Sequence, residues 1–243
     1  MIEGKSPYRQ KEGSHLPSFS IMLLHCDSYV EVIVLRHYFM ESPESRSDPQ
    51  TITVHFQGRT LQFLTDHDVF SKDGLDRGSR LLLETFLEHA KNRCHHQGEI
   101  CRLLDMGCGW GAIGIILAMH FPKAQCVLVD HHPRAVRLAQ ENIRRHGLSN
   151  AEVYLSDGIA AIPDERFDAV LLNPPIHAGK EIVFHLYRDA YTALQHGGAL
   201  WVVIQKKHGA PSTLKYLQTL FEDVHIARRQ SGYQILHAVK NAK

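Results

Sequence analysis

The chain has 243 residues, of which 44% are hydrophobic and 22% are charged, and its formal net charge is +1 at pH 7. This length suits one sizeable domain with room for an appendage, and a core of that size needs no disulfide or metal staple. The near-zero net charge excludes a global attraction to nucleic acid, so RNA contacts would have to come from local basic patches.

Cysteine usage and hydropathy predict a cytoplasmic location. The five cysteines are an odd number and include no C-x-x-C pair, which is typical of reduced thiols. The apolar run at residues 21–35 is interrupted by His25, Asp27 and Glu31, so it is too short and too charged to span a bilayer. The 18 histidines lack the spacing of a metal motif, and we expect no metal site.

Residues 1–36 are predicted to be a flexible N-terminal extension, because their start is polar and punctuated by glycine and proline. The part at residues 21–36 is consistent with either a strand or a short helix. Residues 37–243 are assigned to one domain. Near its start, residues 51–56 and 60–64 alternate apolar and polar side chains around a glycine, which predicts a β-hairpin.

An Asp- and Gly-rich segment, residues 68–80, follows the hairpin and leads into a helix that begins with Leu81. Its composition is consistent with the capped start of a helix as well as with a binding loop.

A strand, a glycine-rich turn and a helix follow one another around residue 107. An apolar run ends at Leu104, then Gly107, Gly109 and Gly111 occupy alternate positions, and residues 113–119 show the apolar face of a helix. Glycine lets the backbone approach a ligand closely, and a helix N-terminus offers unpaired N–H groups to a carboxylate or phosphate. The stretch therefore predicts a cofactor-binding turn.

Two cofactor classes use such a turn. Gly109, Gly111 and Gly114 fit the dinucleotide pattern G-x-G-x-x-G, and Asp130 follows at nearly the expected distance for a ribose-binding acid. Asp105 favours the other class, because a carboxylate two residues before the first glycine would repel a pyrophosphate and attract an ammonium group. The pattern D-x-G-x-G-x-G resembles motif I of the class I S-adenosylmethionine (SAM) methyltransferases, whose cofactor carries an ammonium and a sulfonium.

The rest of the chain alternates strands and helices. Strands are predicted at residues 126–130, 151–155, 167–173, 199–205, 224–228 and 233–239, and helices at residues 133–146, 181–194 and 212–221. This alternation implies right-handed crossovers and a mostly parallel sheet with helices on both faces. The short turn at residues 231–232 makes the last two strands antiparallel. The pattern resembles the Rossmann-like, seven-stranded sheet of class I methyltransferases, with an antiparallel final strand.

Four consecutive strands are expected to end in polar residues, namely Asp105, Asp130, Asp157 and Asn173. Ligands of an open α/β sheet bind beyond the carboxyl ends of its strands, so all four should face one crevice. Asp130 suits the two ribose hydroxyls, since a carboxylate accepts two hydrogen bonds, and Asp157 could accept from the adenine amino group. Asp130 is also consistent with a helix cap, and Asp157 with a turn acid before Gly158.

The motif Asn173-Pro174-Pro175 resembles the (D/N)-P-P-(Y/F/W) motif of methyltransferases that act on an exocyclic or amide nitrogen. The Asn173 side-chain oxygen and the Pro174 carbonyl can both accept hydrogen bonds from an amino group, which aims its lone pair at the methyl group. The prolines fix the backbone of the turn, so both acceptors are preorganised.

Residues 69–79 and 173–180 together resemble the ribosomal RNA small-subunit methyltransferase C-type family, whose members methylate guanine N2 of small-subunit rRNA. The resemblance covers residues 37–243 and is to the single-domain branch. It implies SAM as the cofactor and RNA as the partner, without a membrane, and leaves the oligomeric state open. At the fourth motif position Ile176 replaces an aromatic residue, so another ring would have to stack on a flipped base, with three candidates: His177, Phe184 and Phe70.

The resemblance and the strand ends together assign three sets of site residues. The predicted catalytic set is Asn173, Pro174 and Pro175. The predicted cofactor-binding set is Asp105, Gly107, Gly109, Gly111, Asp130, His131, Asp157, Gly158, Asn173 and Phe70. The predicted substrate-binding set is Ile176, His177, Lys180 and Lys206, in which the lysines follow strand ends near the crevice.

Other functions stay open at this point. The same chemistry suits adenine N6 or the amide nitrogen of a protein glutamine, as in release-factor methyltransferases. A NAD-dependent oxidoreductase is disfavoured by Asp105 and by the Asn-Pro-Pro motif. A non-catalytic SAM-binding module is disfavoured because that motif is intact.

A chain that begins at Arg36 should fold and bind SAM as tightly as the full chain, because residues 1–36 are predicted to lie outside the domain. Circular dichroism and titration calorimetry on both chains test this. Precipitation of the shortened chain, or loss of SAM binding, would mean that the apolar run at residues 21–35 is part of the core.

Overall fold

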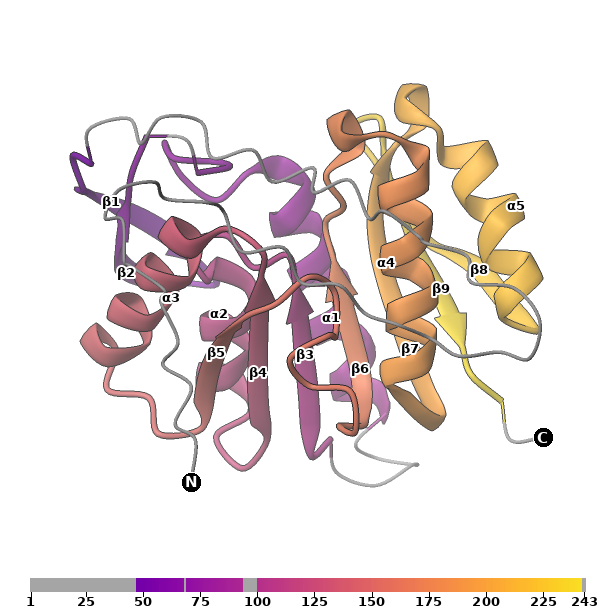
Figure 1. Cartoon of the computed structure of the whole chain (residues 1–243), viewed down its shortest axis with the longest axis horizontal. Helices are drawn as coiled ribbons and strands as arrows, with labels where there is room; N and C mark the ends of the chain where they lie inside the picture. Colours follow the sequence, from indigo (N-terminus) through magenta and orange to yellow (C-terminus); the bar gives the residue numbers. More distant parts are fainter. Residues whose placement is uncertain (1–46, 68, 94–99, 242–243) are drawn as a thin grey trace, which may run out of the picture. The chain divides into compact units, whose positions relative to one another are not determined.

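The computed structural model describes residues 47–67, 69–93 and 100–241 (Figure 1). All of them belong to the second of two units into which the chain divides, Glu44–Lys243. The predicted extension at residues 1–36 lies outside the described residues. Within those ranges, no helix combines the length and the apolar character needed to cross a membrane.

A seven-stranded sheet forms the centre of this unit. Its strands are β3 (Arg102–Met106), β4 (Gln125–Asp130), β5 (Ala151–Leu155), β6 (Phe167–Leu172), β7 (Leu194–Gln205), β8 (Asp223–Gln230) and β9 (Tyr233–Val239). They lie in the order β5-β4-β3-β6-β7-β9-β8. The pairs from β5 to β7 are parallel, whereas β9 is antiparallel to both of its neighbours. The predicted Rossmann-like sheet with an antiparallel final strand is confirmed.

Five helices cover the two faces of this sheet. They are α1 (Arg77–Arg93), α2 (Ala112–His120), α3 (Pro133–Arg145), α4 (Lys180–Ala193) and α5 (Ala210–Leu220). Side chains alternate between faces along a strand, so Leu103 packs with α1, α2 and α3, while Leu104 packs with α4 and α5. Figure 1 shows α4 and α5 in front of the sheet and α1 and α2 behind it. Both faces are buried, as the apolar strand sequences predict.

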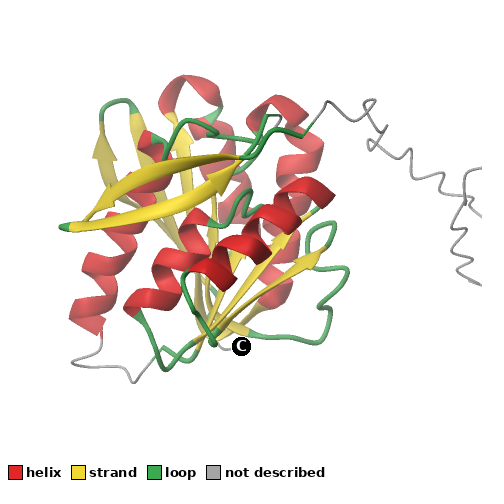
Figure 2. Cartoon of the chain, turned by 90° about the vertical axis from the view of Figure 1, so that its left-hand side faces the viewer, coloured by secondary structure: helices red, strands yellow, loops and turns green. Residues whose placement is uncertain are grey.

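The predicted hairpin is present as a separate antiparallel pair, β1 (Gln50–Phe56) and β2 (Arg59–Thr65) (Figure 2). Asn142 of α3, which is fully buried, ties the hairpin to the rest of the unit. Its Oδ1 accepts from the Leu64 N–H at 2.7 Å, and its Nδ2 donates to the carbonyls of Leu64 at 2.9 Å and Trp110 at 2.8 Å. One side chain therefore joins the hairpin to the glycine turn.

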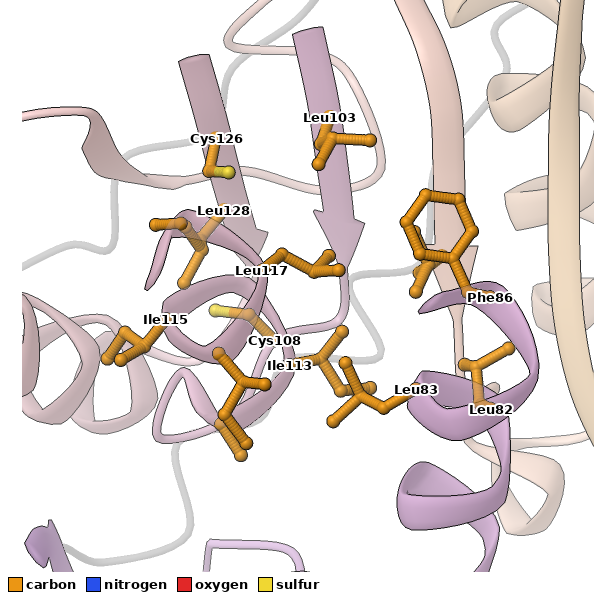
Figure 3. Packing of buried hydrophobic residues seen from close by; sticks show 14 of the residues in the cluster. Leu82, Leu83, Phe86, Leu103, Cys108, Ile113, Ile115, Leu117, Cys126 and Leu128 are labelled. Atoms are coloured by element: carbon orange, nitrogen blue, oxygen red, sulfur yellow. The ribbon is translucent and has the colours of Figure 1, made fainter. Parts of the chain in front are cut away.

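Helix α2 lies unusually close to the sheet. A Cβ on Gly114 would lie 2.4 Å from Leu128 Cγ, so no larger residue fits there without a shift of β4 or α2. The same apolar cluster contains Cys108 from the glycine turn, near Ile113 and Leu117 of α2 (Figure 3). Packing of Cys108 against α2 therefore supports the glycine turn.

Most element boundaries lie within two residues of the predicted ones, but α1, which begins at Arg77, and β7 begin earlier than predicted. Strand β7 begins at Leu194 rather than at residue 199, because Gly197 N–H donates to the Lys240 carbonyl and Lys240 N–H donates to the Gly198 carbonyl, which extends the pairing. Two short 3₁₀ turns, η1 (Ile176–Ala178) and η2 (Lys206–His208), follow β6 and β7 and were not predicted.

Replacing Asn142 with alanine should destabilise the protein by about 3 kcal/mol, because the partly buried N–H and carbonyl of Leu64 and the buried carbonyl of Trp110 would lose their partner at once. Urea unfolding measures the loss. Gln140→Ala, an exposed position on the same helix, is the matched control and should stay within about 0.5 kcal/mol of wild type. An Asn142→Ala protein as stable as the control would show that the hairpin does not depend on this contact.

Candidate functional site

The order of the sheet reverses between β3 and β6, and the carboxyl ends of β3, β4 and β6 meet there. Apart from Phe70, every predicted site residue comes from the ends of β3 to β7 or from the loops and helix starts that follow them. In the described part of the chain, no group of three or more histidine, cysteine or acidic side chains is arranged to hold a metal ion.

The glycine turn between β3 and α2 opens onto free space. Gly107 and Gly109 have φ angles of +71° and +56°, which favour glycine. A Cβ on Gly107 would meet nothing within 4 Å, and one on Gly109 would meet only Val69 Cγ1, at 3.9 Å. The N–H groups of Gly107 and Cys108 both donate to the Val129 carbonyl, at 2.9 and 3.0 Å. A ligand could therefore approach the backbone of a turn that β4 holds in place.

Asp105 lies beneath this turn, with only 2% of its surface exposed. Its Oδ2 accepts from the Gly114 N–H at 2.8 Å, whereas its Oδ1 is buried and has no hydrogen-bond partner within the described ranges. Burial raises the pKa of Asp105 to about 7; the Gly114 N–H opposes this rise and the charge of Asp130 adds to it. The unpaired oxygen keeps its capacity to accept a hydrogen bond or to attract a positive charge.

This position differs from the expected one at the open end of the strand. Met106, not Asp105, is the last residue of β3, and side-chain alternation turns Asp105 toward the face that α1, α2 and α3 cover.

Asp130, at the end of β4, clamps the glycine turn. Its Oδ2 accepts from the Gly109 N–H at 2.8 Å and its Oδ1 accepts from the His132 N–H at 2.9 Å. The cap of α3 is His132, whose Nδ1 accepts from the Arg134 N–H. Each carboxylate oxygen of Asp130 keeps acceptor capacity for a further hydroxyl. His131 is exposed, with its Nδ1 3.7 Å from Asp130 Oδ1.

The turn after β5 is shaped by a side chain from α4. Asp157 is exposed, and Gly158 has a φ of +52°. A Cβ on Gly158 would lie 1.8 Å from Asp189 Oδ2, which also accepts from the Ile159 N–H at 3.2 Å. The Asp189 carboxylate is 3.6 Å from His185 Nε2, and burial raises the pKa of Asp189. A larger residue at position 158 would displace the Asp189 carboxylate, and the positive φ angle also favours glycine there.

Asn173 follows β6 directly and is half-buried. Its Nδ2 donates to Ser79 Oγ at 2.9 Å, which directs Oδ1, the acceptor end of the amide, away from that serine. Ser79 lies in the first turn of α1 and is only 6% exposed. Pro174 is buried, and Pro175 precedes η1. The arrangement presents a fixed hydrogen-bond acceptor at the sheet edge.

The predicted substrate-binding residues lie on neighbouring loops. Ile176 is half-buried and packs against the α4–α5 side of the core, whereas His177 is exposed. The ring of His177 lies 6.2 Å from that of His208, which brings η1 and η2 together. Lys180 begins α4 and Lys206 begins η2, and both are exposed. The loops after β6 and β7 thus place two positive charges on one edge.

Phe70 is 69% exposed, in the segment between the hairpin and α1. Trp110 of the glycine turn fixes this segment, because its Nε1 donates to the carbonyls of Phe70 at 3.2 Å and Ser71 at 3.3 Å. The preceding Val69 is the side chain nearest to the Cβ position of Gly109. An exposed aromatic ring therefore stands beside the glycine turn.

Three side chains that shape the site were not among the predicted residues: Ser79, Trp110 and Asp189. The Asp76-x-Gly-Ser79 pattern was visible as a helix start, and Asp76 Oδ1 does accept from the N–H groups of Gly78 and Ser79. No pattern in the sequence links Ser79 to Asn173, which is 94 residues away.

Comparisons with known proteins agree with this geometry. Residues 60–237 match the family model described as "Methyltransferase small domain". YbxB of Bacillus subtilis (strain 168) is 38% identical over 205 residues, which make up 84% of this chain and 98% of that protein. The ribosomal RNA large subunit methyltransferase G of Ectopseudomonas mendocina (strain ymp) is 31% identical over 209 residues, which make up 83% of this chain and 53% of that protein.

A solved structure shares the fold. It is the 16S rRNA N2 methyltransferase (RsmC) of T. thermophilus in complex with AdoMet and guanosine, with a TM-score of 0.71 and 25% identity, and the match covers 83% of this chain and 53% of that one. The chain thus spans nearly all of YbxB and about half the length of the two rRNA methyltransferases. By its family match and its fold, the chain belongs to the methyltransferase small domain family and is a class I methyltransferase, as its motifs predicted.

Proposed function

We propose that this protein transfers a methyl group to an exocyclic amino nitrogen of RNA, namely guanine N2 of small-subunit rRNA. The proposal rests mainly on the Asn173 side chain. Its amide nitrogen donates to Ser79, which leaves its oxygen as an acceptor at the end of β6, where the strand order of the sheet reverses. An acceptor fixed beside a cofactor turn suits a substrate that brings N–H donors, as an amino group does.

The cofactor is SAM, as its membership of a class I methyltransferase family implies. The glycine turn fits this molecule, because the space above Gly107 is open and the buried Asp105 Oδ1 is unpaired. We propose that Asp105 lies near the ammonium group of the SAM amino-acid moiety and that Asp130 accepts hydrogen bonds from its ribose hydroxyls. When bound, SAM supplies an electrophilic methyl group on a positively charged sulfur. The residues after β5, Asp157 and Gly158, are assigned to the adenine.

Asn173 acts as an orienting group rather than a base. The lone pair of an exocyclic amino group is delocalised into its ring, so the nitrogen is a poor nucleophile. Hydrogen bonds from the two N–H groups to Asn173 Oδ1 and to the Pro174 carbonyl would fix the nitrogen and aim its lone pair at the methyl group. Such alignment by preorganised acceptors lowers the barrier of a transfer that needs two atoms in line.

The RNA assignment rests on the relatives and on the local charge. Two of the three proteins compared above are named as rRNA methyltransferases, and the T. thermophilus structure contains guanosine. Lys180 and Lys206 stand exposed beside the Asn-Pro-Pro turn, where they can neutralise phosphates. Phe70 and His177 are exposed rings that could stack on a base where Ile176 offers no aromatic face.

Purified protein, SAM and rRNA from cells that lack the gene test the proposal directly. Small-subunit RNA should gain N2-methylguanosine, detected by mass spectrometry of nucleosides. Methylation of large-subunit RNA only, of adenine, or of a protein glutamine would each replace the proposed acceptor while leaving the methyltransferase assignment in place.

Asp105→Asn should stabilise the protein increasingly as the pH rises from about 4 to about 7. The pKa of Asp105 in the folded state, about 7, lies above the ordinary value of an aspartate, so the contribution of this group to stability is present at low pH and lost as the pH rises through about 7. Over this range the wild type should lose about 4 kcal/mol of its free energy of unfolding, at about 1.36 kcal/mol for each unit of the pKa difference.

Urea unfolding at several pH values gives the difference between Asp105→Asn and wild type, with the exposed Asp164→Asn as the control for a lost charge. The same Asp105→Asn protein should bind SAM more weakly, by about 1–3 kcal/mol, because the ammonium loses a charged partner. If the difference in unfolding free energy between Asp105→Asn and wild type does not change across this pH range, folding does not raise the pKa of Asp105.

Asn173→Ala should lower kcat by roughly 10²- to 10³-fold, the usual cost of one preorganised hydrogen-bonding group, with little change in SAM affinity. Asn173→Asp keeps an acceptor oxygen and should retain more activity. Single-turnover rates at saturating RNA and SAM measure both variants. The wild-type rate should be flat near neutral pH, and a tenfold rise per pH unit between roughly 6 and 8 would instead indicate a general base, with His177 the nearest candidate.

A further inference from the structure

We propose that Ser79 is a positioning residue for methyl transfer: it holds the Asn173 amide in the one orientation that presents Oδ1, and not Nδ2, to the acceptor amine. This inference rests on the proposed function of Asn173. It concerns a residue of α1 that none of the strand-end motifs contains.

The amide of asparagine has two ends of nearly the same shape but opposite hydrogen-bonding character. Rotation by half a turn about its last torsion exchanges oxygen and NH₂, and this torsion has a broad, roughly two-fold profile. With NH₂ toward the crevice, Asn173 would place a donor against the donors of the substrate amine. A working site therefore needs a partner that selects between the two orientations.

Ser79 is placed to be that partner. Asn173 Nδ2 donates to Ser79 Oγ at 2.9 Å, and Ser79 is 6% exposed, so water competes little for the bond. The serine hydroxyl accepts from the amide nitrogen, which leaves the opposite end of the amide, Oδ1, for the substrate.

The backbone around Ser79 is fixed independently of Asn173. Asp76 Oδ1 accepts from the N–H groups of Gly78 at 2.8 Å and Ser79 at 3.1 Å, which caps the start of α1. A Cβ on Gly78 would lie 3.1 Å from a ring carbon of Tyr233 and 3.3 Å from Val203 Cγ2, so α1 starts in close contact with β9 and β7. Ser79 is thus anchored to the sheet on the side of Asn173.

The test compares the loss of Ser79 in two backgrounds. Ser79→Ala in the wild type should lower the single-turnover rate roughly tenfold, the size expected for one hydrogen bond, while SAM affinity stays within about twofold. In the Asn173→Asp background the same change should cost less than about threefold, because both ends of a carboxylate are acceptors and no wrong orientation exists.

Thr85→Val is the matched control. Thr85 lies on the same helix, is 7% exposed, and its hydroxyl bonds only to the Leu81 carbonyl among the hydrogen bonds of the described structure. Its loss should leave the rate unchanged. An equal cost of Ser79→Ala in both backgrounds, or a fall in SAM affinity that matches the fall in rate, would overturn the proposal, because either result indicates a general structural role.

Nuclear magnetic resonance on protein labelled with ¹⁵N-asparagine tests the contact without RNA or SAM. The Asn173 side-chain NH₂ signal is identified by its absence in Asn173→Asp, and it should shift in Ser79→Ala but not in Thr85→Val. An unchanged signal in Ser79→Ala would overturn the proposal. If this signal shifts as expected while wild-type protein methylates no RNA, the proposed substrate is wrong and the orientation of Asn173 by Ser79 stands.

Discussion

Two buried carboxylates accept hydrogen bonds from the backbone of the glycine turn and of the helix that follows it, and the rest of the site depends on these two bonds. Asp105 accepts from the Gly114 N–H at the start of α2, and Asp130 accepts from the Gly109 N–H. Both bonds satisfy backbone donors that a helix start and a tight turn would otherwise leave unpaired. This arrangement carries an electrostatic cost, since the Asp130 charge helps to raise the pKa of Asp105. A cationic group bound at the turn would offset part of that repulsion.

A single stretch of chain joins the glycine turn to the Asn-Pro-Pro turn. Trp110 holds the Phe70 carbonyl at one end of this stretch, and Ser79 binds Asn173 at the other. Methyl transfer needs donor and acceptor atoms aligned to within a fraction of an ångström. A stretch fixed at both ends relates the two turns directly, in addition to the sheet that carries them, and the hairpin supports the glycine turn through Asn142.

Much of this architecture follows from short-range patterns. Strands buried on both faces appear as continuous apolar runs, such as Cys126–Val127–Leu128–Val129 in β4, and helices appear as apolar stripes, so the order of strands and helices was predictable. The glycine turn and the Asn-Pro-Pro turn were predictable for the same reason. Each depends on the backbone preferences of a few adjacent residues, and the crossover rules then bring them to one edge of the sheet.

The sequence by itself therefore determined the fold class, the glycine turn after β3 and the place of Asn173 after β6, whereas the tertiary structure decided where the side chains point and what they touch. Asp105 shows why: it lies within β3 rather than after it, and side-chain alternation along the strand turns it toward the face that α1, α2 and α3 cover. The contacts of Asn173 with Ser79 and of Gly158 with Asp189 join residues far apart in the chain. Such contacts leave no periodic signal, because they exist only after separate helices have packed on the sheet.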